Sequence, residues 1–156
     1  MHSRMTNPVF LVPEALKALN TLGTSIAKGG VPNTTLELVR LRASQINGCS
    51  MCVEMHASDL KKAGEKDERL FAVAAWREAP YFSDAERAAL ALTEAATRIA
   101  DRAEPVSDEV WNEAAKHYDE KALADLVLHI AQINFWNRVN VMVRQIAQEV
   151  PKAAAA

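Results

Sequence analysis

Apolar residues recur along the chain at intervals of three and four positions, the spacing that places side chains on one face of an α-helix. Seven such segments lie between helix-breaking residues, and the β-branched residues form no alternating run that would predict a strand. The pattern predicts an all-α protein of about six to seven helices, over residues 13–28, 34–46, 49–62, 67–79, 83–100, from 107 onwards, and 121–148.

Two of these segments begin with the sequence pattern of a capping box. Ser83 is followed three residues later by Glu86, and Thr34 by Glu37. In a capping box the hydroxyl accepts from a backbone N–H of the first turn, and the glutamate accepts from the backbone N–H of the capping residue. We therefore expect helices to start at Ser83 and at Thr34.

The last segment is the longest, and between Leu123 and Val143 it is apolar on nearly every side. Such a helix lies either in the centre of the core or against another subunit. Six shorter helices cannot cover it in one chain of 156 residues, so we predict a homo-oligomer. On this basis His129 is expected to be an interior or interface histidine, and Asn134 and Asn137 to form hydrogen bonds that set the register of the oligomer.

The length and composition indicate one domain with a sizeable core. The chain has 156 residues, of which 49% are hydrophobic, with only 5 Gly and 6 Pro. No linker or internal repeat divides it. We expect a single domain over residues 1–150, with its core at 14–100, followed by a disordered tail at 151–156.

Charge and hydropathy exclude several classes of partner. The chain carries 18 basic and 20 acidic residues, for a net charge of −2, which argues against a nucleic-acid partner because such surfaces need a basic face. No run of about 18 apolar residues predicts a membrane span. The N-terminus lacks an apolar run of secretory length, so we expect a cytoplasmic protein in a reducing environment.

The only two cysteines form a Cys-x-x-Cys pair, Cys49 and Cys52, and His56 follows. On a helix these three residues fall within roughly 60° of one another, so their functional groups share one face. Cys49 lies at the expected helix start, where free N–H groups and the helix dipole favour a thiolate. Glu37, on the preceding helix, is the carboxylate best placed to orient the imidazole.

These four residue types support redox chemistry at sulfur. A thiolate that attacks a peroxide becomes a sulfenic acid, and a second thiol one turn away condenses with it to a disulfide. An imidazole beside them can accept and return the proton. The same four side chains, Cys49, Cys52, His56 and Glu37, would also make a four-ligand zinc set, which stays open as an alternative.

The spacing of Glu, eleven residues, Cys-x-x-Cys, three residues and His resembles the signature of the alkylhydroperoxidase D (AhpD) / carboxymuconolactone decarboxylase family. Glu37, Cys49, Cys52 and His56 match its four positions. The resemblance implies an AhpD-like helical fold, trimers or hexamers, and peroxidase or disulfide-reductase chemistry. It also implies that Cys52 is the peroxidatic thiol and Cys49 the resolving thiol.

The chain departs from that signature at one position. Fuller versions in peroxidase members have a second histidine directly before the second cysteine, where this chain has Met51. The proton network is correspondingly thinner. The decarboxylase branch typically lacks the cysteine pair, so lactone decarboxylation is not expected.

The predicted function is that of a thiol-dependent hydroperoxidase with an antioxidant role, acting without a cofactor or a bound metal. Its expected partners are a hydroperoxide substrate and a lipoamide- or thioredoxin-like dithiol reductant. Three alternatives remain: a protein or lipoamide disulfide reductase, a zinc-binding module, and a non-catalytic redox-sensing member of the family.

Overall fold

The computed structural model describes residues 2–100 and 102–148, and none of these forms a β-strand. The all-α prediction is confirmed. The tail expected at 151–156 lies outside the described residues. The described part contains eight α-helices and one 3₁₀ turn: α1 (Pro8–Leu11), α2 (Pro13–Ile26), α3 (Asn33–Asn47), α4 (Ser50–Lys62), α5 (Asp67–Ala72), η1 (Val73–Ala75), α6 (Asp84–Thr97), α7 (Asp108–His117) and α8 (Glu120–Val143).

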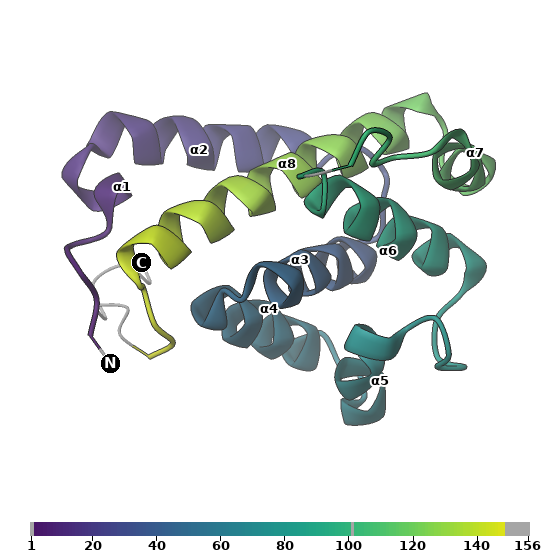
Figure 1. Ribbon diagram of the computed structural model, residues 1–156, viewed down its shortest axis with the longest axis horizontal. Coiled ribbons are helices and arrows are strands. Elements are labelled where there is room, and N and C mark those ends of the chain that lie inside the picture. Colours follow the sequence, from purple (N-terminus) through teal and green to yellow (C-terminus); the bar gives the residue numbers. More distant parts are fainter. Residues whose placement is uncertain (1, 101, 149–156) are drawn as a thin grey trace.

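Helix α3 is the centre of the fold. It packs against α4, α6, α8 and η1, and in Figure 1 it lies between α4 on one side and α8 on the other. Five consecutive residues, 35–39, are buried, which requires neighbours around the whole circumference of the helix. The sequence pattern left the last helix either in the centre of the core or against another subunit, and the structure gives the central place to α3.

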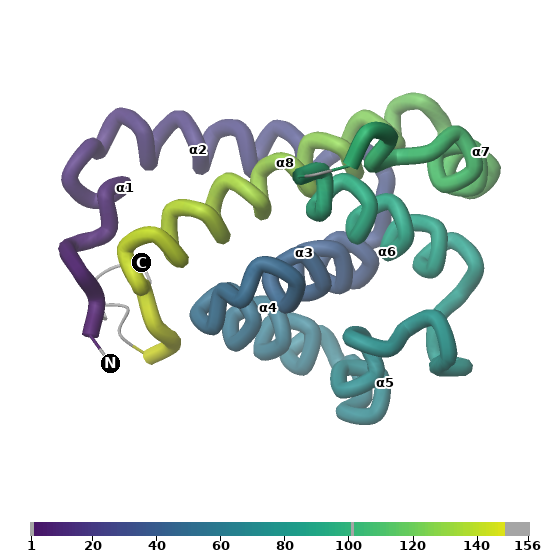
Figure 2. Tube along the Cα trace, in the orientation of Figure 1, coloured from purple at the N-terminus to yellow at the C-terminus, as the bar shows by residue number. Residues whose placement is uncertain are grey.

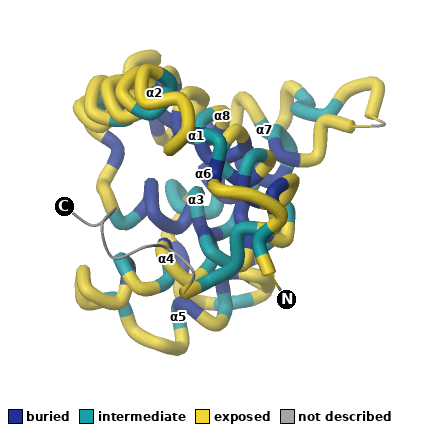
Figure 3. The backbone as a smooth tube through the Cα atoms, turned by 90° about the vertical axis from the view of Figure 1, so that its left-hand side faces the viewer, coloured by how far each residue is buried: buried dark blue, intermediate teal, exposed yellow. Residues whose placement is uncertain are grey.

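Helix α8 runs from the end of the molecule where α7 lies to the N-terminal segment. Helix α2 lies along α8 on the side away from α3 (Figure 2). Figure 3 shows that α2 is mostly exposed while buried residues collect on α3, α6 and α8. Ile26 is the one buried residue of α2. None of the described helices is long and apolar enough to cross a membrane.

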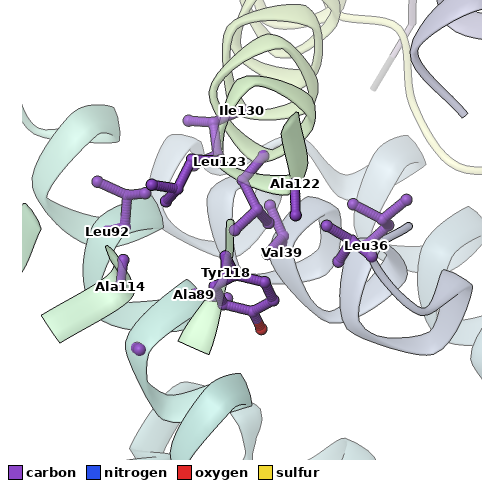
Figure 4. Close-up of a cluster of buried hydrophobic side chains, with 12 residues drawn as sticks. Leu36, Val39, Ala89, Leu92, Ala114, Tyr118, Ala122, Leu123 and Ile130 are labelled. Atoms are coloured by element: carbon purple, nitrogen blue, oxygen red, sulfur yellow. The ribbon is translucent and has the colours of Figure 1, made fainter. Parts of the chain in front are cut away.

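Two apolar clusters hold the helices together. The larger joins α3, α6, α7 and α8, and Figure 4 shows Leu36 and Val39 of α3 meeting Leu123 and Ile130 of α8. The second joins α3 to α4, α5, η1 and α6 around the fully buried Leu38 and other apolar side chains. Because α3 contributes to both clusters, its two faces are fixed independently.

The helix ends differ from the predicted ones in three places. The four-residue α1, capped by Asn7, was not expected, because so short a helix has no periodic face. The segment predicted at 67–79 divides into α5 and η1, a tighter turn that leaves both Val73 and Trp76 buried. The long helix ends at Val143 rather than 148, because Arg144 takes a left-handed conformation with φ of 54° and closes a Schellman motif.

One of the two capping boxes is present. Ser83 accepts from the backbone N–H of Glu86, and the Glu86 carboxylate accepts from the backbone N–H of Ser83. The box expected at Thr34 and Glu37 is wrong, because α3 begins one residue earlier and has no side-chain cap. The Glu37 carboxylate is directed away from the helix start, toward other side chains described below.

The turn after α2 is fixed by a carboxylate. Asp125 of α8 is buried and its Oδ2 accepts from the backbone N–H of Gly29 at 2.9 Å. A Cβ built on Gly29 would overlap this carboxylate, so no side chain fits there.

We expect Gly29→Ala to lower the free energy of unfolding by about 1–3 kcal/mol, because the carboxylate must move and its hydrogen bond is lost. The matched control is Gly23→Ala inside α2, where a Cβ would meet only the flexible end of Gln132 at 3.2 Å. That variant should be neutral or up to about 1 kcal/mol more stable, since alanine favours helix. Urea denaturation followed by circular dichroism measures both, and equal stabilities of the two variants would contradict the overlap.

Candidate active site

A two-residue turn between α3 and α4 places the first thiol. Gly48 has a φ of 68°, a left-handed conformation suited to glycine, and the backbone N–H groups of Gly48 and Cys49 donate to carbonyls of the last turn of α3. Cys49 is thereby the N-cap residue of α4, as the sequence predicts. Cys52 follows one turn later on the buried side of the helix.

The two thiols are free and lie side by side. Their Sγ atoms are 2.8 Å apart, and the residues are only 2% and 1% exposed. A hydrogen bond from the Cys52 S–H lowers the pKa of the Cys49 thiol to about 6, and giving that bond, together with burial, raises the pKa of Cys52. Cys49 is therefore the more acidic thiol of the pair, and Cys52 holds its proton toward the Cys49 sulfur.

His56 is oriented by Glu37, as predicted. The two side chains are buried, with His56 Nδ1 2.7 Å from Glu37 Oε2. Burial acts to raise the pKa of the Glu37 carboxyl, but the hydrogen bond from His56 and the charge of Arg40 outweigh it, so the pKa lies below its usual value. An ionised Glu37 accepts a hydrogen bond from Nδ1–H of His56, and in the neutral form of the imidazole the lone pair then lies on Nε2.

That Nε2 atom is buried, and no hydrogen-bond partner for it lies within the described ranges 2–100 and 102–148. A buried polar atom without a partner is costly in a folded protein. Such an atom in a candidate active site suits a proton acceptor that waits for its substrate.

Arg40 extends the network to α8. Its guanidinium pairs with Glu37, and its Nη2 lies 2.8 Å from Nδ1 of His129. His129 is fully buried, as expected for an interior histidine. Burial and the adjacent charge of Arg40 lower the pKa of His129, so its ring is neutral and Nδ1 accepts from Arg40. The Glu37 carboxylate is thus held from both sides.

A cavity of about 1100 Å³ opens beside Cys52 and His56. Its walls come from the N-terminal segment, α2, α4 and α8, and they include the apolar side chains of Met51, Phe10 and Trp136. Cys49 does not line it. The cavity therefore reaches the Cys52 sulfur, whereas Cys49 is the more acidic thiol of the pair.

The asparagines of α8 have partners within the chain. Asn47 Nδ2 donates to the side-chain oxygens of Asn134 and Asn137, each at 2.9 Å, and Asn137 Nδ2 donates to Ser44 Oγ at 3.1 Å. The expectation that Asn134 and Asn137 bond across an oligomer interface is wrong. They instead hold the α3–α4 turn against α8.

Sequence reasoning missed two residues that contact the site. These residues are Arg40 of α3 and Asn140 of α8. Asn140 Nδ2 donates to Cys52 Sγ at 3.3 Å. Its signal in the sequence is the spacing of three that continues the series of Asn134 and Asn137.

The four residues of the zinc alternative do not converge on one point. Among the described residues, the set whose ligand atoms lie within 4.8 Å of one another is Glu37, His56 and Asp59, which contains neither thiol. The thiols contact each other and Asn140 instead. This geometry gives no support to a zinc site built from the cysteine pair.

A family model and several known proteins match this chain. The model of the carboxymuconolactone decarboxylase family matches residues 13–95, more than half of the chain. The uncharacterized protein YdfG of Bacillus subtilis is 40% identical over 131 residues, which are 84% of this chain and 88% of that protein. The alkyl hydroperoxide reductase AhpD of Methylocella silvestris is 38% identical over 63 residues, 40% of this chain and 33% of its own.

Among solved structures, ATU0492 of Agrobacterium tumefaciens superposes with a TM-score of 0.87 at 30% identity, covering 96% of this chain and 100% of the other. Its function is unknown, and it carries the provisional name of antioxidant defence protein AhpD. The fold, the matched residues 13–95 and the extended identity to YdfG show that the chain belongs to the carboxymuconolactone decarboxylase family, as an AhpD-like member.

Proposed function

We propose that the protein is a thiol-dependent hydroperoxidase with an antioxidant role, in which Cys52, Cys49, His56 and Glu37 carry the reaction. The observation that supports this most directly is the buried, unpartnered Nε2 of His56, on a side chain that lines the same cavity as Cys52. The names of the AhpD relatives point to the same chemistry.

In the first step the Cys52 thiolate attacks the terminal oxygen of a hydroperoxide, ROOH. The S–O bond forms as the O–O bond breaks, which oxidises the sulfur to a sulfenic acid and releases RO⁻. The alkoxide takes a proton to leave as ROH. His56 suits this transfer, because its Nε2 accepts the first proton that the thiol pair loses and returns it to the leaving oxygen.

In the second step Cys49 attacks the sulfenic sulfur of Cys52. A disulfide forms and hydroxide leaves, which takes up a proton to become water. The 2.8 Å between the sulfurs means that closure needs little movement. An external dithiol small enough to enter the cavity then reduces the disulfide by exchange and returns both thiols.

The negative charge and the access for substrate favour different sulfurs. Movement of one proton between the two sulfurs resolves this difference. Cys49 holds the anion more readily, but the cavity reaches Cys52. Transfer of the proton from Cys52 to Cys49 across the 2.8 Å contact produces the thiolate that faces the cavity. We therefore assign the attack to Cys52 and the resolving role to Cys49.

Burial of the pair favours a small substrate over a protein disulfide. With exposures of 2% and 1%, neither sulfur is accessible to the disulfide of a folded partner. A hydroperoxide of modest size fits the cavity of about 1100 Å³, whose apolar walls suit an organic group. A disulfide reductase is the less favoured function on this ground.

We also propose that a second copy of the chain covers the exposed face of α8. Leu128, Phe135 and Met142 are exposed and recur every seven residues, the spacing of a helix–helix seam. Ala131 lies between Leu128 and Phe135 on the same face, Ala124 precedes Leu128 by one turn, and both alanines are exposed. An apolar stripe of this length along one helix favours a homo-oligomer.

The first prediction concerns peroxide consumption with cumene hydroperoxide as substrate and dithiothreitol as reductant. Cys52→Ser should abolish it, and Cys49→Ser should slow it, with part of Cys52 over-oxidised to the sulfinic acid, detected by mass spectrometry, because the protecting disulfide no longer closes. His56→Ala should lower the rate between about a hundredfold and ten-thousandfold. His117→Ala, a histidine far from the thiols, is the control, and an equal loss in both histidine variants would contradict the role of His56.

The second prediction concerns Glu37→Gln and pH. Because the folded-state pKa of Glu37 is lowered, the stability that it contributes is fully present above its ordinary value of 4.5 and disappears as the pH falls through the lowered pKa. The variant should be less stable than the wild type by about 2 kcal/mol at pH 7, with the difference shrinking below about pH 4. Denaturant titrations across this range test the sign, and a difference that grows on acidification would refute it.

The third prediction concerns assembly. Phe135→Glu should convert an oligomer to monomer at micromolar concentration, since a charge in an apolar seam is not solvated. Phe71→Glu on α5, at a side chain 80% exposed against 43% for Phe135, is the matched control and should leave the oligomer intact. Sedimentation velocity measures both, and a monomeric wild type would remove the basis of the proposal.

A further inference from the structure

The N-terminal segment reaches the active site through a chain of side-chain amides whose direction is determined. The first member is Asn7, the N-cap of α1, whose Oδ1 lies 3.3 Å from the backbone nitrogen of Val9. A backbone N–H only donates, so the atom of Asn7 that faces it must be the oxygen. The amide nitrogen of Asn7 therefore points the other way.

That nitrogen meets Asn140 of α8. Asn7 Nδ2 donates to Asn140 Oδ1 at 2.8 Å, which fixes the orientation of the second amide as well. The remaining group of Asn140 is its Nδ2, which lies 3.3 Å from Cys52 Sγ. The backbone N–H of Val9 thus fixes the orientation of both amides. As a result, an N–H of Asn140 faces Cys52 Sγ.

The whole chain is shielded from water. Asn7 is 5% exposed, Asn140 is 3% exposed and Cys52 is 1% exposed. A lost donor at such positions can be replaced by solvent only from the cavity that they line, and a hydrogen bond to a charged group is worth more than one between neutral groups. The segment before α1 is also tied down, because the backbone N–H of Arg4 donates to the Val143 carbonyl at 2.8 Å.

We propose that Asn140 is a catalytic residue that stabilises the Cys52 thiolate by its N–H, and that Asn7 is a positioning residue that keeps this donor directed at the sulfur. The inference rests on the proposed function, in which Cys52 is the attacking thiol. It assigns the N-terminal segment a part in the chemistry that the Cys-x-x-Cys spacing does not indicate.

Asn140 donates to Cys52, the sulfur that attacks the peroxide in the proposed reaction. The second thiol draws the negative charge toward Cys49, away from the cavity. A donor on Cys52 Sγ opposes this and makes the proton transfer between the sulfurs less unfavourable. Because its 3.3 Å contact is with Cys52 Sγ, Asn140 stabilises a thiolate at the sulfur that faces the cavity.

The test uses Cys49→Ser as background, so that Cys52 titrates alone. The probe variant is Asn7→Asp, which keeps the oxygen that caps α1 and removes only the N–H₂ that faces Asn140. The new carboxylate then attracts the amide nitrogen of Asn140, so the amide turns and its oxygen faces the sulfur. The pKa of Cys52, measured from the pH dependence of iodoacetamide alkylation, should rise by about one pH unit, a roughly tenfold lower thiolate fraction.

The matched control is Asn20→Asp, which places the same negative charge in the wall of the same cavity at a residue without a contact to either thiol in the described structure. It should shift the pKa of Cys52 by no more than about 0.3 pH unit, since an exposed charge is screened. Asn7→Ala removes the donor without adding charge and should raise the pKa by about half a unit.

Circular dichroism establishes that each variant is folded, and Asn7→Ala decides the matter if Asn7→Asp does not fold. An unchanged pKa in folded variants at Asn7, or an equal shift in Asn20→Asp, would overturn the inference. Because alkylation needs neither a peroxide nor a reductant, this result stands apart from peroxide turnover. A failed peroxidase assay with the expected pKa shifts would reject the proposed function alone.

Discussion

The hydrogen bond between His56 Nδ1 and Glu37 Oε2, 2.7 Å long and buried, is the interaction on which the site depends. It joins α3 to α4 and determines which imidazole nitrogen is free. Burial of an ionised carboxylate is costly, and Arg40 offsets that cost from the other side of Glu37. The neutral ring of His129 in turn accepts from Arg40. The His56 imidazole is therefore the end of a network that spans three helices.

The same three helices determine what reaches the thiols. Helix α3 is enclosed by its neighbours and keeps Glu37 and Arg40 from moving. Helix α4 presents Cys52 and His56 to the cavity, and Met51 adds an apolar wall where fuller signatures of the family have a histidine. Helix α8 closes the site with Asn140 and Trp136. A site built from the central helices rather than from loops keeps its geometry between catalytic steps.

Much of the site could be predicted because its residues are near in sequence. Cys49, Cys52 and His56 fall on one face of a helix by the helical repeat alone, and a preceding helix ending at Gly48 brings Glu37 back alongside. Periodicity likewise located the main helices. Periodicity does not show α1, which is too short to have a period. The capping pattern at Thr34 was misleading, because Glu37 pairs with His56 and Arg40 instead.

The sequence by itself determined the helical class, the shared face of the thiols and imidazole, and the family signature, since all of these depend on spacings of a few residues. Only the tertiary structure decided that α3 is central, that Asn134 and Asn137 bond within the chain, and that Asn7 and Asn140 reach Cys52. Those contacts join residues as many as 133 positions apart. No local pattern encodes such pairs, because they arise from how the packed helices bring distant polar groups together out of water.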